Sequence, residues 1–235
     1  MKIGFIGSGP LAREVAKPLA LANHDVMMSN SRGPQTLQEV AKDLGCRVGS
    51  SREAAQFGDV IVLAVPFHQV PHLHADMFAG KIVLDATNYY PTRDGRIAEL
   101  DELRTATSEI VARQLPQARI VKAFNSIMQA DVDRDRRPPG AKDRRALPIA
   151  SDDAQAKSVA ATLVNDAGFD PFDAGSLADS WRFERAMPAY CMWVDRLQLQ
   201  KLLDAARRGE EVPHDAWKVA SLARSQALKE SAPAP

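Results

Sequence analysis

The sequence has few cysteines and no net charge. Two cysteines, Cys46 and Cys191, lie far apart among 235 residues, which excludes a disulfide framework and favours a reducing compartment. We expect both to be small buried side chains. Lys plus Arg equal Asp plus Glu at 30 each, so charge indicates neither a nucleic-acid nor a membrane partner. No apolar run could span a bilayer and no signal peptide opens the chain, so we expect a cytoplasmic protein.

The chain begins with an apolar strand, residues 2–6, followed by a glycine-rich turn of the pattern Gly-x-Gly-x-x-Ala. Gly7 permits a tight turn, Gly9 lets a pyrophosphate approach the backbone, and Ala12 lets the next helix pack closely on the sheet. That helix, about 10–21, directs free amide groups at phosphates. Since a strand precedes the turn and a helix follows it, the pattern predicts a dinucleotide site. The expected contacts are Gly7, Ser8, Gly9, Pro10 and Leu11.

A second strand, 24–28, ends in a polar segment where an NAD-binding chain would carry a carboxylate. A carboxylate there accepts hydrogen bonds from the ribose hydroxyl and repels a 2′-phosphate. This chain offers hydroxyls, an amide and a guanidinium instead. Arg32 can fork onto the phosphate and stack on adenine, in a contact worth about 1.5–3 kcal/mol. The sequence therefore predicts NADP(H), with contacts from Ser29, Asn30, Ser31 and Arg32.

Strands and helices alternate along the rest of the chain, which predicts a Rossmann-type α/β fold with a doubly wound, mostly parallel sheet. Further strands are expected near 47–48, 59–65, 81–86 and 119–124, with helices at 36–44 and 108–115. A strand–helix–strand unit follows at 146–150, 153–167 and 170–173. We expect residues 1–176 to form the NADP-binding domain.

The segment 177–230 is expected to be a small C-terminal helical part. Apolar residues recur at helical spacing from Met187 to Leu203, which predicts one long helix. The segment is too short to be an independent catalytic domain. It could pack on the core of its own chain or against a second copy, and we favour a homodimer. The tail 231–235 is expected to be disordered.

With these elements placed, the chain resembles the F420-dependent NADP oxidoreductases and the related reductase domain of the STEAP metalloreductases. Six segments carry the resemblance: Ile6-Gly7-Ser8-Gly9, Ser29-Asn30-Ser31-Arg32, Leu63-Ala64-Val65-Pro66, Asp85-Ala86-Thr87-Asn88, Lys122-Ala123-Phe124-Asn125 and Asp173-Ala174-Gly175-Ser176-Leu177. The resemblance implies hydride transfer between NADP(H) and a flavin-like acceptor: F420, FAD or FMN. It also implies nicotinamide contacts along two strand ends, at Ala64, Val65, Pro66, Thr87 and Asn88. The segment 122–125 looks more like the STEAP version, but the membrane part of STEAP proteins is absent, so haem-linked metal reduction is not implied.

No catalytic residue is assigned, because hydride transfer between two rings mainly requires that they be stacked. The acceptor-site candidates are His68, Asn88, Asn125 and Ser176. His68 could touch the acceptor or face solvent, and the asparagines could bind a carboxamide or cap turns. His68 and His72 are four apart, but Pro71 lies between them and no third ligand is apparent, so we expect no metal.

Two other functions stay open. A reductase of a small hydroxy acid or imine would need a proton donor, and Lys201 is the lysine that could supply it. A non-enzymatic sensor would bind NADP(H) without turnover. The loop 131–145 is rich in arginine: it is either a basic flap that attracts a phosphorylated acceptor or a solvated loop whose aspartates offset the charge.

Overall fold

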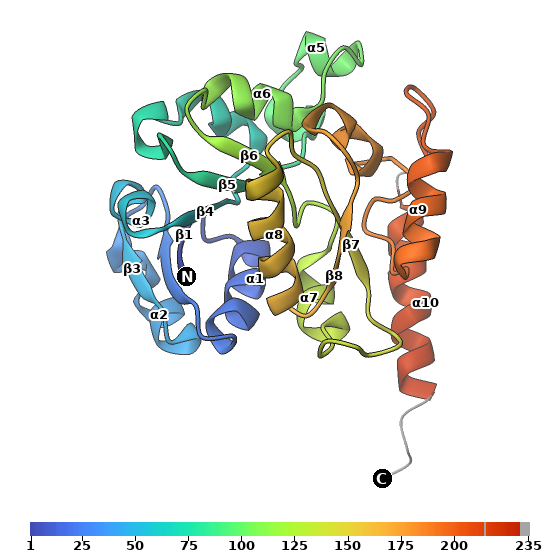
Figure 1. Ribbon diagram of the computed structural model, residues 1–235, viewed down its shortest axis with the longest axis horizontal. Coiled ribbons are helices and arrows are strands. Elements are labelled where there is room, and N and C mark those ends of the chain that lie inside the picture. The colour runs from blue at the N-terminus through green and yellow to red at the C-terminus, as the bar shows by residue number, and fades with distance from the viewer. Residues whose placement is uncertain (214, 231–235) are drawn as a thin grey trace.

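A six-stranded parallel sheet lies at the centre of the computed structural model, which describes residues 1–213 and 215–230 (Figure 1). Its order is β3-β2-β1-β4-β5-β6, and every pairing is parallel. The predicted Rossmann-type fold is confirmed. The strands are β1 (Lys2–Ile6), β2 (Asp25–Ser29), β3 (Arg47–Gly49), β4 (Val60–Leu63), β5 (Ile82–Asp85) and β6 (Arg119–Lys122).

The strand order reverses between β1 and β4, and this reversal positions the ligand crevice. The chain first moves outward from β1 to β2 and β3, then returns to pair β4 with the other side of β1. Loops that leave neighbouring strands in opposite directions open a crevice at the carboxyl ends of the strands. The segments after β1, β2, β4 and β5 therefore meet at one edge of the sheet.

Helices cover both faces of the sheet, which is why its strands are almost continuously apolar. On one face, Ile3, Phe5 and Val62 belong to a buried cluster with residues of α1 (Pro10–Leu21). On the other face, Ile6 and Leu63 belong to a cluster with α3 (Ser51–Phe57) and α6 (Thr107–Gln114). The shorter elements are α2 (Gln38–Leu44), α4 (Pro91–Asp94), α5 (Ala98–Asp101), η1 (Pro34–Leu37), η2 (Phe67–His72) and η3 (Ala75–Phe78).

The predicted strand–helix–strand unit forms a small sheet of its own beside the main one. β7 (Ala146–Ile149) and β8 (Asp170–Asp173) pair in parallel, with α8 (Ala154–Asp166) between them in sequence. An isolated antiparallel bridge joins Lys122 at the end of β6 to Ala150, with N–O distances of 2.9 and 3.2 Å. The unit therefore extends the fold past β6, at the same end as the crevice.

The predicted helix from 187 to 203 is wrong for its first half. After η4 (Leu177–Phe183) the chain is irregular, and α9 spans only Arg196–Ala205. Ala186 and Cys191 have φ of +66° and +57°, left-handed values that break a right-handed helix. Their apolar neighbours are buried nonetheless, because the irregular segment itself packs on the core. Here the spacing of the apolar residues reflects their burial and not a helical backbone.

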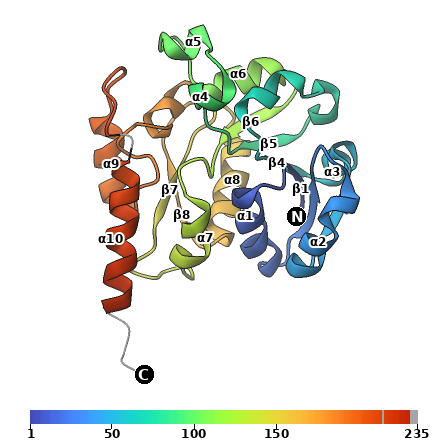
Figure 2. The ribbon, with the colours of Figure 1, turned by 180° about the vertical axis from the view of Figure 1, so that it is seen from behind.

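The C-terminal helices lie side by side at one end of the molecule, next to the small sheet (Figures 1 and 2). α9 places Leu199 and Leu203 in a buried cluster with Ala146 of β7, and α10 (Ala216–Glu230) follows. The inward face of α9 is thus covered within the chain, and the homodimer stays a prediction. In the described part of the chain no helix is both long and apolar enough to cross a bilayer. The tail 231–235 lies outside the described residues.

The two cysteines differ in their surroundings. Cys191 is buried, as expected, whereas Cys46 is only partly buried. Burial raises the pKa of the Cys191 thiol to about 12. It also raises the pKa of Cys46, against a smaller opposing hydrogen bond. Both side chains therefore stay protonated near neutral pH, and neither carries the charge of a reactive thiolate.

Aspartates offset much of the positive charge of the segment 131–145, as expected of the solvated-loop alternative, but both ends of the segment are buried. Its first residues belong to α7 (Gln129–Asp135). Arg145 is fully buried, and its guanidinium lies 3.3 Å from Asp131 and 3.0 Å from Asp135. Arg144 is also buried and pairs with Asp170 of β8 at 2.7 Å. Both ends of the segment are therefore tied to the fold by buried ion pairs, while Arg136 and Arg137 are paired with aspartates nearer the surface.

Replacing Arg145 with Met should destabilise the protein strongly. The substitution leaves the buried Asp131 and Asp135 to share Arg134, and loss of one partner from a buried ion pair typically costs about 3–5 kcal/mol. Arg136→Met is the matched control, because Arg136 pairs with Asp133 at the surface, where such pairs contribute about 0–1 kcal/mol. The free energy of unfolding is measured by urea denaturation. Equal losses in the two variants would contradict this role of Arg145.

Candidate functional site

The glycine turn after β1 has the geometry of a phosphate cradle. Gly7 has φ of +112°, and an added Cβ would collide with the carbonyl oxygen of Ala64, so no other residue fits. At Gly9 a Cβ would meet no atom within 4 Å, which leaves open space above the backbone. Gly9 is also the N-cap of α1, whose start has neither a capping side chain nor an acidic residue in its first turn. Pro10 carries no N–H, so the free amides at the start of α1 are those of Leu11 and Ala12, which can bind an anion.

A cavity of about 490 Å³, here called the Arg32 cavity, opens beside this turn. No aspartate or glutamate lines it. Arg32 is exposed, and its guanidinium forms no ion pair with a carboxylate in the described part of the chain. The cavity thus offers a free positive charge and no repulsion to a phosphate. The lining residues are Ile6, Gly7, Ser8, Gly9, Asn30, Ser31, Arg32, Ser51, Ala64, Val65, Pro66, His68, Gln69, His72, Leu73, His74 and Met77.

Asn30 fixes the segment that carries Arg32. Its amide nitrogen donates to the hydroxyls of Ser8 (3.3 Å) and Thr36 (2.9 Å), and its oxygen accepts from the backbone N–H of Arg32 (3.0 Å). The β2 segment is thereby fastened to the glycine turn. Ser29 is placed differently from the other three expected contacts: it is buried, and its hydroxyl donates to the backbone oxygen of Phe5 at 2.7 Å.

A second cavity of about 310 Å³, here called the Asn88 cavity, continues the first along the strand ends. Both cavities are lined by Gly9, Ala64, Val65 and Pro66, so they form one groove across β1, β4, β5 and β6. The remaining lining residues are Pro10, Leu11, Ala12, Ala86, Thr87, Asn88, Tyr90, Arg93, Asn125, Ile127, Met128, Gln129 and Tyr190. The groove lies at the position of a dinucleotide site in this fold.

Asn88 and Asn125 hold each other at the far end of the groove. The Asn88 amide donates to the backbone oxygen of Asn125 at 2.8 Å. The Asn125 amide donates to Asn88 Oδ1 (3.3 Å) and to the backbone oxygen of Phe183 (3.1 Å). Two buried oxygens here, Thr87 Oγ1 and Asn125 Oδ1, have no hydrogen-bond partner. Buried polar atoms normally have one, so these atoms fit a polar group of a ligand.

A buried ion pair supports this end of the groove from below. The Lys122 ammonium lies 3.1 Å from Asp85 Oδ2, and it donates to the backbone oxygen of Thr87 (2.6 Å) and the hydroxyl of Thr107 (2.8 Å). Lys122 and Asp85 are fully buried. The pair therefore fixes the chain at Thr87, directly before Asn88.

The four acceptor-site candidates do not all line the same cavity. Asn88 and Asn125 share the Asn88 cavity, but His68 lines the Arg32 cavity. Ser176 lines neither cavity, and its hydroxyl donates to Asp179 at 2.6 Å at the start of η4. Lys201, the proton donor of the alternative reading, is exposed on α9 and also lines neither. Among the described residues, no group of three metal-ligating side chains occurs.

Asp94 contacts residues of both cavities, and the sequence pattern did not mark it as a site residue. Its buried carboxylate lies 2.9 Å from His68 Nδ1 and accepts two hydrogen bonds from Arg93 (2.8 Å each) and one from the N–H of Tyr90 (2.9 Å). Burial alone would raise the pKa of Asp94, but the hydrogen bonds from Arg93, Tyr90 and His68 outweigh it and lower the pKa to about 2. One ionised group thus orders His68 in the Arg32 cavity and Arg93 in the Asn88 cavity.

Two tyrosines also form part of the site without having been singled out. The hydroxyls of Tyr90 and Tyr190 lie 2.7 Å apart, and both residues line the Asn88 cavity. Burial raises the pKa of Tyr190 far above its usual range, so its hydroxyl stays protonated. The two residues are 100 positions apart, and no local pattern marks either as a site residue.

The fold is that of Rossmann-type domains, and the groove lies where such domains bind a dinucleotide. Within that class, residues 2–89 match the family described as "NADP oxidoreductase coenzyme F420-dependent". The matched residues include the glycine turn, the segment that carries Arg32 and the ends of β4 and β5. The resemblance to this family, expected from six short segments, is confirmed.

Individual proteins agree with this assignment. The chain is 32% identical to rat Metalloreductase STEAP3 over 200 residues, which are 80% of this chain and 38% of STEAP3. Among solved structures, a hypothetical protein from Sinorhizobium meliloti is 29% identical with a TM-score of 0.70, covering 83% of this chain and 95% of that one. A candidate F420-dependent NADP reductase from Arthrobacter sp. FB24 is 25% identical with a TM-score of 0.64, covering 77% and 87%. The chain spans about half the length of the curated relatives it matches, 58% and 38%.

Replacing Asp94 with Asn should remove a pH-dependent part of the stability. Because the pKa of Asp94 is lowered on folding, its contribution is present above about pH 4 and is lost as the pH falls toward 2. A shift from 3.8 to about 2 corresponds to roughly 2 kcal/mol. In urea denaturation, wild type should exceed Asp94→Asn by about that amount at pH 6 and by clearly less at pH 3.

The control for this experiment is Glu39→Gln, a change on the exposed surface of α2 that should stay within about 0.5 kcal/mol of wild type. A difference between wild type and Asp94→Asn that is constant from pH 6 to pH 3 would contradict the role assigned to the ionised carboxylate.

Proposed function

We propose that the chain transfers a hydride between NADP(H) and a flavin-like acceptor, F420, FAD or FMN. One observation carries the proposal: a cavity with a free arginine and no carboxylate runs into a second cavity at the ends of β4, β5 and β6. The first cavity suits a nucleotide with a 2′-phosphate, and the second leaves room for a ring beside the nicotinamide. The description of the matching family supports this choice of acceptor.

At the nucleotide end, Ser31 and Arg32 would bind the 2′-phosphate, and the amides after Gly9 would bind the pyrophosphate. The backbone at Val65 and Pro66 would hold the ribose and nicotinamide against the groove. When bound, the reduced nicotinamide supplies the hydride, and the protein contributes binding and orientation.

At the acceptor end, the walls are fixed by internal contacts. Asn88 and Asn125 bond each other, and the Tyr90 and Tyr190 hydroxyls form a second pair. Rigid walls suit a reaction whose main demand is two stacked rings with reacting atoms about 3–3.5 Å apart. The chain would act as a clamp that holds donor and acceptor in register.

The residue expected for the first alternative does not reach the groove. A reductase of a small hydroxy acid or imine was expected to use Lys201, which lies outside both cavities. A sensor would bind NADP(H) and transfer no hydride. Homodimer formation and a cytoplasmic location remain predictions from the sequence.

An acceptor screen tests the proposal. The purified protein is mixed with NADPH and F420, FAD or FMN in turn, and absorbance at 340 nm is followed. We expect oxidation of NADPH with at least one of them. Binding of NADPH without oxidation in any mixture would contradict the proposal and would favour the sensor.

Replacing Arg32 with Ala should weaken NADPH binding selectively. Loss of a charge-assisted contact with the 2′-phosphate costs about 1.5–3 kcal/mol, which is on the order of ten- to a hundredfold in Kd. NADH lacks that phosphate, so its Kd should change little. Calorimetric titration measures both, with Arg104→Ala as a control at an exposed arginine outside the groove. Equal losses of affinity for the two nucleotides would show that Arg32 does not bind the 2′-phosphate.

A further inference from the structure

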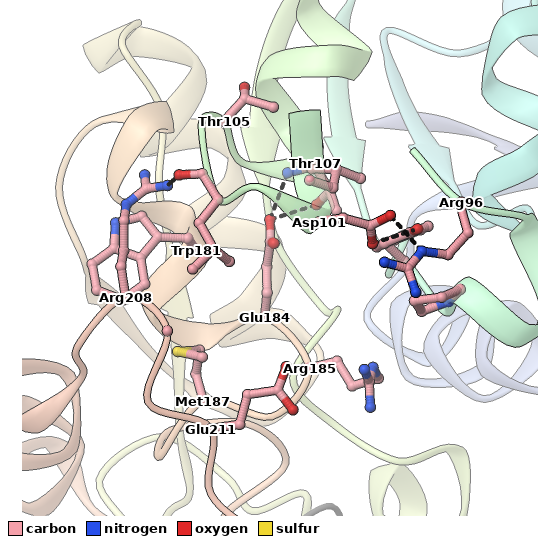
Figure 3. Close-up of a pocket in the computed structure, with 15 residues that line it drawn as sticks. Arg96, Asp101, Thr105, Thr107, Trp181, Glu184, Arg185, Met187, Arg208 and Glu211 are labelled. Atoms are coloured by element: carbon pink, nitrogen blue, oxygen red, sulfur yellow. Dashed lines mark hydrogen bonds and ion pairs between the residues drawn. The ribbon is translucent and has the colours of Figure 1, made fainter. Parts of the chain in front are cut away.

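A third cavity of about 190 Å³, here called the Trp181 cavity, lies beside the Asn88 cavity and is shown in Figure 3. Segments far apart in the sequence build it: α5 with its flanks, the start of α6, the end of η4 and the loop after α9. Its lining residues are Tyr89, Pro91, Arg96, Leu100, Asp101, Leu103, Thr105, Thr107, Trp181, Glu184, Arg185, Met187, Arg208, Gly209 and Glu211. It does not form part of the nucleotide groove.

Three guanidinium groups line this cavity, and two of them lack a carboxylate. Arg96 is paired, since its Nε lies 2.7 Å from Asp101. Arg185 and Arg208 form no ion pair with any carboxylate in residues 1–213 and 215–230. Arg208 instead donates to the backbone oxygen of Leu103 at 2.6 Å and lies over the Trp181 ring, 4.9 Å from its centroid (Figure 3). Both guanidiniums keep donors free for a ligand.

The carboxylates of the cavity are not paired with these two arginines. Glu184 is occupied: it accepts from the N–H of Thr107 (2.8 Å) and from the hydroxyl of the same residue (2.5 Å). Glu211 is exposed, and no ion pair joins it to an arginine of the cavity. The formal charges of the cavity balance, three arginines against Asp101, Glu184 and Glu211, but among the described residues Arg185 and Arg208 each keep a guanidinium without a carboxylate partner.

A single pair of side chains separates this cavity from the acceptor end of the groove. The Arg185 guanidinium lies 5.6 Å from the centroid of the Tyr90 ring. Arg185 lines the Trp181 cavity, and Tyr90 lines the Asn88 cavity. Tyr89 and Pro91, on either side of Tyr90, also line the Trp181 cavity. Residues 89–91 thus form a wall between the two cavities, and the Arg185 guanidinium lies close to it.

We propose that the Trp181 cavity binds a phosphate or carboxylate group carried by the acceptor, with the acceptor's ring in the Asn88 cavity. This inference rests on the proposed function. Guanidinium groups suit the task because they bind such oxyanions through paired N–H donors. The expectation that arginines attract a phosphorylated acceptor thus moves from the segment 131–145, where Arg144 and Arg145 are tied up in ion pairs, to Arg185 and Arg208.

FMN and riboflavin are matched probes, because they share one ring system and differ by a phosphate. Quenching of flavin fluorescence measures the Kd of each for the full chain saturated with NADP⁺. Wild type should bind FMN about tenfold or more tightly than riboflavin, as expected for a charge-assisted contact. Arg185→Met and Arg208→Met should each shrink that preference and leave the Kd of riboflavin and NADP⁺ unchanged. Arg207→Met, an exposed neighbour outside the cavity, should keep it.

Inorganic phosphate tests whether the anion must be part of the acceptor. Millimolar phosphate should weaken FMN binding to wild type and leave riboflavin unaffected. If phosphate instead strengthens riboflavin binding to the level of FMN, a separate anion occupies the cavity, and the link to the acceptor is wrong.

Three further results would overturn the inference: equal affinities for FMN and riboflavin, a preference that survives both arginine variants, or no binding of either flavin. Failure of the proposed function has a different signature. In that case FMN is still preferred and the arginine variants abolish the preference, but no mixture with NADPH loses absorbance at 340 nm.

Discussion

The close approach of Gly7 to the carbonyl of Ala64 is the constraint on which the site depends. It lets the turn after β1 lie directly against the end of β4, where any side chain at position 7 would collide. The open space at Gly9 and the free amides of α1 follow from that turn. Because Asn30 fastens the β2 segment to Ser8 of the same turn, Arg32 is positioned by it as well. The nucleotide groove is thus built outward from one backbone contact.

Buried charges hold the rest of the groove in place. The Lys122–Asp85 pair fixes the chain at Thr87, and the Asp94 carboxylate orders His68 on one side and Arg93 with Tyr90 on the other. Such pairs add little net stability but cost much when one partner is lost. Their value here is geometric: they fix the chain at Thr87 and the positions of His68 and Arg93 along the groove.

The sequence was sufficient to predict those features of the fold and the site that a local pattern of residues determines. Period and turn chemistry predicted the six main strands, the glycine turn and the free arginine at the end of β2, because each is determined within a few residues. Prediction from the sequence failed where the conformation or burial of a residue depends on contacts with residues far away in the chain. Residues 187–195 are not helical, since tertiary packing accepts left-handed conformations at Ala186 and Cys191. Arg145 is buried by carboxylates of α7, and Asp94 resembles an ordinary turn residue. The residues that line the Trp181 cavity are spread between positions 89 and 211, and no spacing in the sequence predicts that they meet.

The proposed function requires that the groove bind a dinucleotide through its 2′-phosphate. NADPH and NADH differ only in that group, so calorimetric titration of the unmodified protein with each of them is the decisive measurement. NADPH should bind more tightly by about ten- to a hundredfold. Equal affinity for the two, or no binding of either, would refute the assignment.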